Sequence, residues 1–200
     1  EQLFRVLRGV CASSIIAGDI GHAERMAMEC LQIGESTSDA DFLIEGHCPL
    51  GYVRWVNGAD LGSARQHLES MMALYRENGG IAKALLTAQD PLVQSLGPLY
   101  LTYYAMGDQD NADATQAAFL ETLEGLGPGF DLASALTWYA FTMLISRNYQ
   151  ASVDYAARAI ALCEEHGYVA FLGPATLTHA LSRGHLSGSD EEPDLHVPRE

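Results

Sequence analysis

The feature that most constrains the fold of this chain is a turn that recurs four times between helix-like segments. Its polar residue is Asp19, Asp60, Asp108 and Asn148, and four positions later comes a small residue, Ala23, Ala64, Ala112 and Ser152. Successive turns are separated by 41, 48 and 40 residues. A polar residue of this kind ends one helix and caps the next, while the small residue lets the two helices approach closely. The chain is therefore predicted to be a series of helical hairpins.

Apolar residues at helical spacing fill the segments between the turns, and no strand-like alternation competes with them. Glycine and other helix breakers delimit nine predicted helices, over residues 2–17, 21–34, 40–57, 61–77, 91–106, 110–126, 130–147, 149–166 and 168–183. A hairpin of two amphipathic helices cannot bury its apolar face alone, so hairpins stack on one another. We expect an all-α fold over residues 1–183, a right-handed α-solenoid of about four hairpins plus a trailing helix.

Three internal prolines and two segments depart from this regular pattern. Pro49, Pro98 and Pro174 fall inside predicted first helices of hairpins, where each is expected to kink or break its helix. Residues 78–90 form the longest irregular connection, which accounts for the 48-residue interval. Residues 184–200 are acidic, polar and proline-containing, and are expected to form a loosely ordered tail or linker.

Composition excludes several classes of protein. The 200 residues carry 26 acidic and 11 basic side chains, a net charge of −15, which argues against a nucleic-acid partner for this segment. No apolar run approaches the roughly 20 residues needed to span a bilayer, so no membrane partner is expected. The four cysteines lack both CxxC spacing and disulfide density, which favours buried free thiols in a reducing, cytoplasmic compartment. The chain opens without Met and with helical periodicity already running, as expected for a piece of a longer protein.

Motifs for catalysis and metal binding are missing from the sequence. It contains no GxxxxGK[ST] phosphate loop, no GxSxG nucleophile elbow and no HExxH zinc motif, and its seven histidines lack metal-ligand spacing. We therefore expect no catalytic residues, no metal and no cofactor, and a chain that is not itself an enzyme.

Aromatic residues are the candidates for a binding site. They gather on three predicted first helices, with one arginine among them: Tyr52, Arg54 and Trp55; Tyr100, Tyr103 and Tyr104; Trp138 and Tyr139. Residues three or four apart share a helix face, which would either fill the core between hairpins or border a groove for a ligand. Arg54 would either form a surface salt bridge or anchor a carboxylate or phosphate. Both alternatives stay open for each residue.

Residues 40–183 resemble a known family in several ordered segments. The run from Leu50 to Tyr75, LGYVRWVNGADLGSARQHLESMMALY, is followed by Gln89-Asp90-Pro91, then by LGPGFDLA at 126–133 and ALCEEHGY at 161–168. This set is similar to the tetratricopeptide-like region that lies C-terminal to the ATPase module of bacterial signalling proteins. Some of these proteins carry a LuxR-type DNA-binding domain and others a class III nucleotide cyclase. Repeat intervals of 40–48 residues depart from the standard 34.

The resemblance implies a sensor or protein-interaction arm that binds a partner protein, a peptide or a small effector in its concave groove. On that basis we expect a non-enzymatic binding domain of a larger cytoplasmic regulator, with a transcription-factor output. The alternatives are an oligomerisation or scaffold arm, with a homodimer as its product, and the regulatory region of a nucleotide cyclase.

Overall fold

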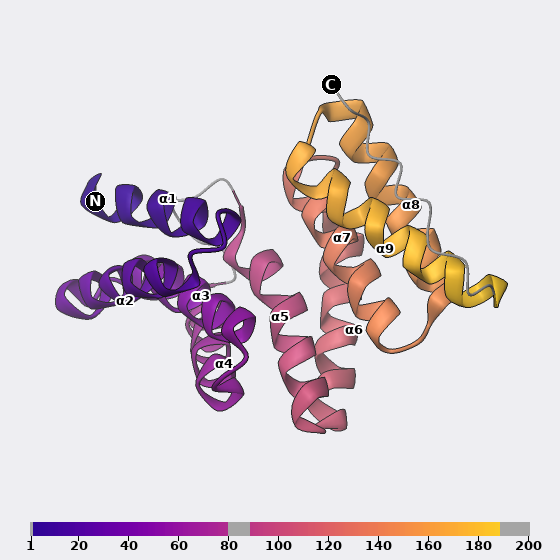
Figure 1. The fold of residues 1–200 in the computed structure, drawn as a ribbon. Coiled ribbons are helices and arrows are strands. Elements are labelled where there is room, and N and C mark those ends of the chain that lie inside the picture. Colours follow the sequence, from indigo (N-terminus) through magenta and orange to yellow (C-terminus); the bar gives the residue numbers. More distant parts are fainter. Residues whose placement is uncertain (1, 80–88, 189–200) are drawn as a thin grey trace. The chain divides into compact units, whose positions relative to one another are not determined.

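The computed structural model describes residues 2–79 and 89–188, and within them every regular element is a helix (Figure 1). The helices are α1 (Gln2–Ile16), α2 (Ile20–Thr37), α3 (Ala40–Asn57), α4 (Leu61–Glu77), α5 (Pro91–Met106), α6 (Gln109–Gly125), α7 (Phe130–Ile145), α8 (Tyr149–His166) and α9 (Val169–Ser187). The all-α prediction is confirmed, and each predicted helix matches one of these. The bounds predicted for α3, α4, α5 and α8 are those observed.

Two predicted segments fall partly or wholly outside the described residues. The predicted tail was placed from residue 184, but α9 continues through Ser187, so that boundary is wrong by four residues. The C-terminal part of α9 is held on α8 by Ser182. This side chain is fully buried, and its hydroxyl donates to the hydroxyl of Ser152. Most of the irregular connection, residues 80–88, and the rest of the tail, residues 189–200, lie outside the described residues.

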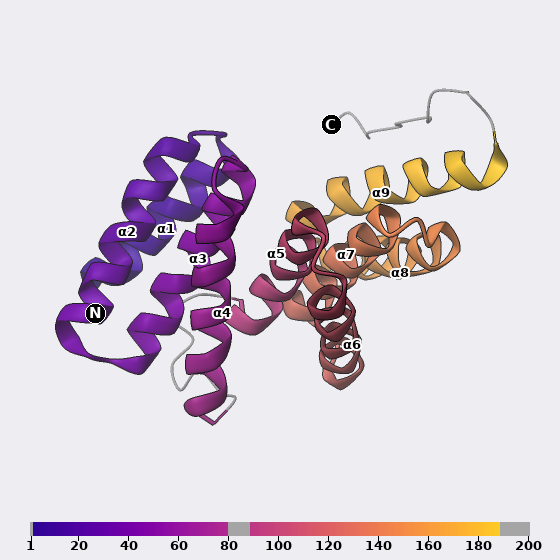
Figure 2. The same cartoon turned by 90° about the horizontal axis from the view of Figure 1, so that it is seen from below.

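The chain divides into two compact units, residues 1–116 and residues 117–200, with the division inside α6. In unit 1, α2 packs on α1 and α3, and α5 packs on α3 and α4, so α3 lies at the centre of the unit (Figures 1 and 2). In unit 2, α8 packs on α7 and α9, and α9 also packs on α7. A right-handed solenoid running through both units stays a prediction.

The four recurring turns share one set of hydrogen bonds. In each, the Asp or Asn side chain accepts from the backbone N–H three residues later, over 2.9–3.4 Å. Its carbonyl accepts from the N–H of the small residue four positions later, over 3.0–3.1 Å. All four small residues are fully buried. The capping and close-packing roles predicted for these two positions are therefore confirmed.

The internal prolines do not break their helices. α3, α5 and α9 run without interruption through Pro49, Pro98 and Pro174. A proline removes one helical hydrogen bond at a cost of about 3 kcal/mol. Pro49 and Pro98 are buried in helices that each pack on at least two neighbours, and this packing outweighs the loss.

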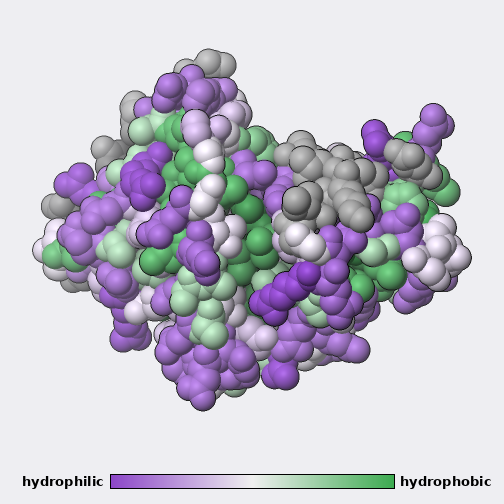
Figure 3. Space-filling view, turned by 180° about the vertical axis from the view of Figure 1, so that it is seen from behind, coloured by the Kyte–Doolittle hydropathy of each residue, from purple (hydrophilic) through white to green (hydrophobic). Residues whose placement is uncertain are grey.

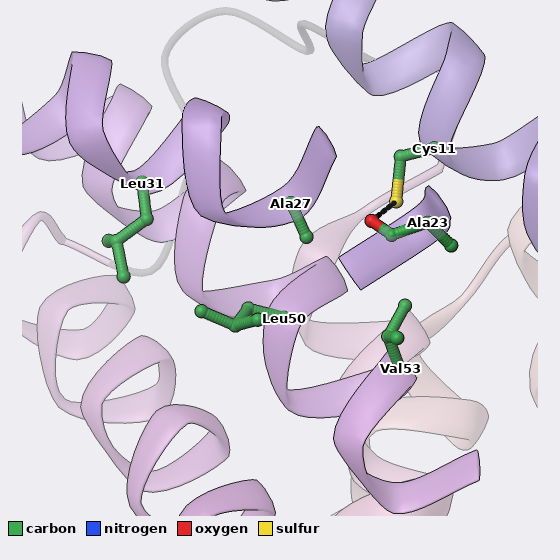
Figure 4. Packing of buried hydrophobic residues seen from close by; sticks show 6 residues of the cluster. All are labelled: Cys11, Ala23, Ala27, Leu31, Leu50 and Val53. Atoms are coloured by element: carbon green, nitrogen blue, oxygen red, sulfur yellow. Dashed lines mark hydrogen bonds between the residues drawn. The ribbon is translucent and has the colours of Figure 1, made fainter. Parts of the chain in front are cut away.

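A compact core joins α1, α2 and α3 (Figure 4). Its members are Cys11, Ala23, Ala27, Leu31, Leu50 and Val53, and the thiol of Cys11 donates to the carbonyl of Ala23 over 3.4 Å. Alanine side chains on α2 bring the helix axes close, and Gly46 of α3 brings them closer still. A Cβ at Gly46 would lie 2.7 Å from the Cα of Leu31, so only glycine fits this crossing.

Candidate ligand-binding site

A hollow of about 430 Å³ opens on unit 1 between α2 and α4. These two helices both pack on α3, and residues of α2 and α3 form the floor. The lining residues are Arg25, Met28, Glu29, Leu31, Gln32 and Glu35 from α2, Leu50 and Arg54 from α3, and His67 from α4. Leu31 and Leu50 also belong to the core in Figure 4, so the floor of the hollow is the outer surface of that core.

Arg54 makes most of the hydrogen bonds on the polar side of the hollow. Its Nε donates to Glu24 Oε1 of α2 over 3.1 Å, and its Nη1 donates to Ser63 Oγ and, over 3.0 Å, to His67 Nε2 of α4. One guanidinium therefore ties three helices together at the side of the hollow. Arg54 and Glu24 are about one quarter exposed, so this is the partly exposed salt bridge that was one of the two alternatives.

The bond from Arg54 determines where the protons lie on two histidines. A guanidinium is only a donor, so His67 Nε2 must be the acceptor, and neutral His67 carries its proton on Nδ1. His67 Nδ1 lies 2.9 Å from His47 Nδ1 and therefore donates to it. Neutral His47 then carries its proton on Nε2. The four side chains form one directed chain of hydrogen bonds, from Arg54 through His67 to His47, with Glu24 accepting at its start.

Both histidines are held in their neutral form. Burial lowers the pKa of His67 to about 4, with smaller contributions from His47 and Arg54. Burial also lowers the pKa of His47, although the carboxylate of Glu35 opposes the shift. A second proton on either ring would place two donors face to face. The chain of hydrogen bonds is therefore intact at neutral pH and weakened by acid.

The open side of the hollow carries charged side chains without bonded partners in the described part of the chain. Within the described part of the chain, Arg25 has no hydrogen-bond or ion-pair partner, and Arg54 Nη2 has no acceptor. Glu29 and Glu35, both exposed on α2, likewise make no ion pair with any described residue. Unused donors at the wall and unpaired carboxylates at the rim are the groups that an incoming ligand would meet.

A second polar cluster lies in the interior, between α1, α3 and α5. Nε and Nη2 of Arg8 donate to Glu45 Oε2 over 3.2 and 3.1 Å, and Nη2 also reaches Gln94 Oε1. Cys48 donates to the same Gln94 oxygen over 3.1 Å. Arg8 is 4% exposed and Glu45 is 0% exposed. Burial is the largest single effect and lowers the pKa of Arg8, but the charges of Glu45, Cys48 and Cys11 and the hydrogen bond to Glu45 together raise it above its usual value.

Most of the predicted aromatic residues of unit 1 serve packing. Tyr100 and Tyr103 are buried, and the Tyr103 hydroxyl donates to Glu69 over 2.7 Å. Tyr52 and Trp55 are half-buried with ring centroids 5.8 Å apart, and Tyr52 packs against the core cluster of Figure 4. None of these four lines the hollow.

Tyr104 is the most exposed tyrosine of the predicted set, at 37%, with its ring stacked on Tyr100 at 6.0 Å. In unit 2, Tyr139 is buried between Phe119 and Tyr155, with ring centroids 5.3 and 4.7 Å away. Trp138 is half-buried and packs edge-on to Phe141. Of the eight predicted residues, Arg54 is the one that lines the hollow.

Sequence reasoning missed the rest of the hollow and the buried pair. Arg25, Glu29 and Glu35 have the spacing of an ordinary solvated helix face, and only the position of α4 makes that face one wall of a hollow. Arg8 and Glu45 are 37 residues apart, and no local pattern links them. The signal available was the helical register of Arg8, which shares a face with Phe4 and Cys11 in a stripe that is otherwise apolar.

Cysteine chemistry and metal binding give no further candidate. All four cysteines are free and buried, which confirms the prediction of buried thiols. Burial raises the pKa of Cys30 and of Cys48 to about 12, which suppresses the thiolate. Over residues 2–79 and 89–188, no three His, Cys, Asp or Glu side chains are grouped to hold a metal ion. No described helix combines the length and apolarity that crossing a bilayer requires.

Neither the models of known protein families nor the curated proteins give a match to this chain.

Proposed function

We propose that this chain is a non-enzymatic binding and sensor domain of a larger bacterial signalling protein. It captures a small effector, a peptide or a segment of a partner protein, and so regulates a transcription-factor output. The observation that carries the proposal is the hollow between α2 and α4. Among the residues that the structure describes, its wall presents Arg25 without a partner and Arg54 with an unused donor.

Capture in the hollow would act on the packing of three helices at once. Arg54 already links α2, α3 and α4 through Glu24, Ser63 and His67. A ligand that contacts the same three helices would favour the packing in which all its contacts are made. Differential affinity of this kind shifts the balance between on and off states of an attached output domain. A nucleotide cyclase is the alternative output that the resemblance implies.

An assembly arm is the second candidate, favoured by apolar side chains exposed on α9. Val169, Leu177, Leu181 and Leu186 are between 37% and 79% exposed. Figure 3 shows, on the face drawn there, hydrophobic residues exposed among hydrophilic ones. Apolar side chains exposed on one helix favour pairing with another helix, including one from a second copy of the chain.

Native mass spectrometry over a range of protein concentrations separates the two candidates. The sensor proposal expects a monomer that retains a small molecule or acquires one from a metabolite mixture. Met28→Trp, at a half-exposed lining residue, should block this capture, while the control Ala73→Trp, on an exposed site of α4 outside the hollow, should not. A dimer that forms with concentration and carries nothing would contradict the sensor proposal and favour the assembly arm.

A further inference from the structure

Two guanidinium groups with unused donors line one hollow. Arg25 has no partner among the described residues, and Arg54 keeps Nη2 unbonded after its bonds to Glu24, Ser63 and His67. A guanidinium presents its N–H groups as a planar fork that matches the oxygens of a carboxylate or phosphate. An oxyanion in the hollow would therefore find donors from two helices, α2 and α3.

Part of the lining of the hollow is apolar. Met28 is 50% exposed, and Leu31 and Leu50 form the floor beside it. Sites for small molecules are mostly apolar with a few placed polar groups, and a volume of 430 Å³ lies within their usual range. The apolar floor would contact the body of a ligand, and the two arginines would bind its charged end.

We propose that the hollow binds a small molecule with an apolar body and a single oxyanion, a carboxylate or a phosphate. The oxyanion lies at Arg25 and Arg54, and the apolar body lies on Met28, Leu31 and Leu50. This inference rests on the proposed function, because it names the ligand class of the same site.

The carboxylates at the rim limit the ligand to one anionic group. Glu29 and Glu35 stand on α2 beside Arg25, and neither makes an ion pair with a described residue. A second anionic group would lie near these carboxylates and be repelled, as it would by the net charge of −15. Polyanions such as nucleic acid are excluded by the same charges.

The test is a titration of the ¹⁵N-labelled full chain, followed by amide chemical shifts, with four probes. Octanoate and octyl phosphate carry the proposed chemistry, 1-octanol lacks the charge, and inorganic phosphate lacks the apolar body. A ligand of about ten heavy atoms at about 0.3 kcal/mol per atom binds in the millimolar range. Octanoate or octyl phosphate should bind at least about tenfold more tightly than octanol, with shifts on α2, α3 and α4, since hydrogen bonds to a charged group are the stronger ones. The stronger of the two identifies the oxyanion.

Variants locate the charge recognition. Arg25 is exposed and has no partner within residues 2–79 and 89–188, so Arg25→Gln should keep the fold. It should weaken the binding of octanoate about tenfold and leave the binding of octanol unchanged. Arg76→Gln is the matched control, because it removes an exposed arginine of α4 that does not line the hollow. Glu29→Gln should strengthen the binding of octanoate, because it removes a negative charge near the proposed carboxylate position.

Two results would overturn the inference. Equal binding of octanol and octanoate in the hollow would remove the oxyanion preference and leave the proposed binding function standing. A lack of shifts on α2, α3 and α4 with all four probes would also overturn it. The proposed function is tested separately, by the effect of Met28→Trp on capture in native mass spectrometry.

Discussion

The buried ion pair between Arg8 and Glu45 offers the sharpest test of what holds unit 1 together. Each charge is at least 96% removed from water, and the two are joined by bonds of 3.1 and 3.2 Å. Three variants separate their contributions: Glu45→Gln, Arg8→Met, and the double variant Arg8→Met/Glu45→Met. The first keeps the shape of the side chain and removes only its charge.

The expected magnitudes follow from desolvation. Removing one partner leaves the other charge buried without its counterion, which costs about 3–5 kcal/mol of unfolding free energy. Replacing both charges with apolar side chains of similar volume removes that cost and is often neutral or stabilising. Gln94 keeps an interior partner in the double variant, because Cys48 still donates to its side-chain oxygen. Each single variant should therefore be much less stable than the double variant.

Tryptophan fluorescence can follow unit 1 alone. The chain has two tryptophans, Trp55 in unit 1 and Trp138 in unit 2. In a Trp138→Phe background, Trp55 is the only tryptophan and reports on unit 1 during urea unfolding. With a slope of about 2 kcal/mol per M, the single variants should lower the urea midpoint by about 1.5–2.5 M.

The outcome that refutes this reasoning is specific. If the double variant is less stable than either single variant, the pair contributes net stability and the desolvation argument fails. A loss below about 1 kcal/mol in Glu45→Gln would mean that the site is solvated. Arg5→Met controls for the substitution itself, since Arg5 lies on the same helix and is exposed.

Four further results are expected from equally local features. Gly46→Ala should cost about 1–3 kcal/mol in urea unfolding, because the new Cβ would overlap Leu31, and an unchanged midpoint would contradict that crossing. Asp60→Ala should cost about 1 kcal/mol by removing the cap of α4, and Asp60→Asn should restore most of it. The pKa of His67, lowered from 6.5 to about 4 by burial and its neighbours, means that the unfolded chain binds a proton in this window that the native chain does not. Stability should therefore fall as pH falls from 6.5 to 4, and His67→Gln should flatten that slope by less than about 1.4 kcal/mol per pH unit, since the side chain is partly exposed to solvent. Cys48, whose pKa burial raises to about 12, should react with a disulfide reagent orders of magnitude more slowly in the native chain than in urea, and rapid native labelling would show the interior to be open.

The fold of each hairpin was predictable because its determinants are local. A cap bond spans three residues and a glycine C-cap spans four, so the turn residues define where helices begin and end. The continuity of the helices through Pro49 and Pro98 was not predictable, for the opposite reason. Each proline removes one helical hydrogen bond, but the packing of α3 and α5 on neighbouring helices outweighs this loss. That packing is not visible in a short window of sequence.

The site was harder to predict because it depends on how helices approach each other. Tyr100 and Tyr139 had the spacing of either core or groove residues, and both are buried against their neighbours. Arg25 and Glu35 looked like solvent-facing charges, which they are, but α4 stands opposite and makes their face a wall. Arg54 was identified because an arginine beside aromatic residues on one helix stands out locally.

The four capped turns have a consequence for the order in which the chain folds. Bonds that close over three or four residues form with little loss of chain entropy, and proteins rich in such local contacts fold within microseconds to milliseconds. The bonds of Arg8 span 37 residues to Glu45 and 86 residues to Gln94. The charges of Arg8 and Glu45 stay hydrated until α1, α3 and α5 pack together. They therefore lose their water late in folding. We expect Glu45→Gln to change mainly the rate of unfolding, while Asp60→Ala changes the rate of folding.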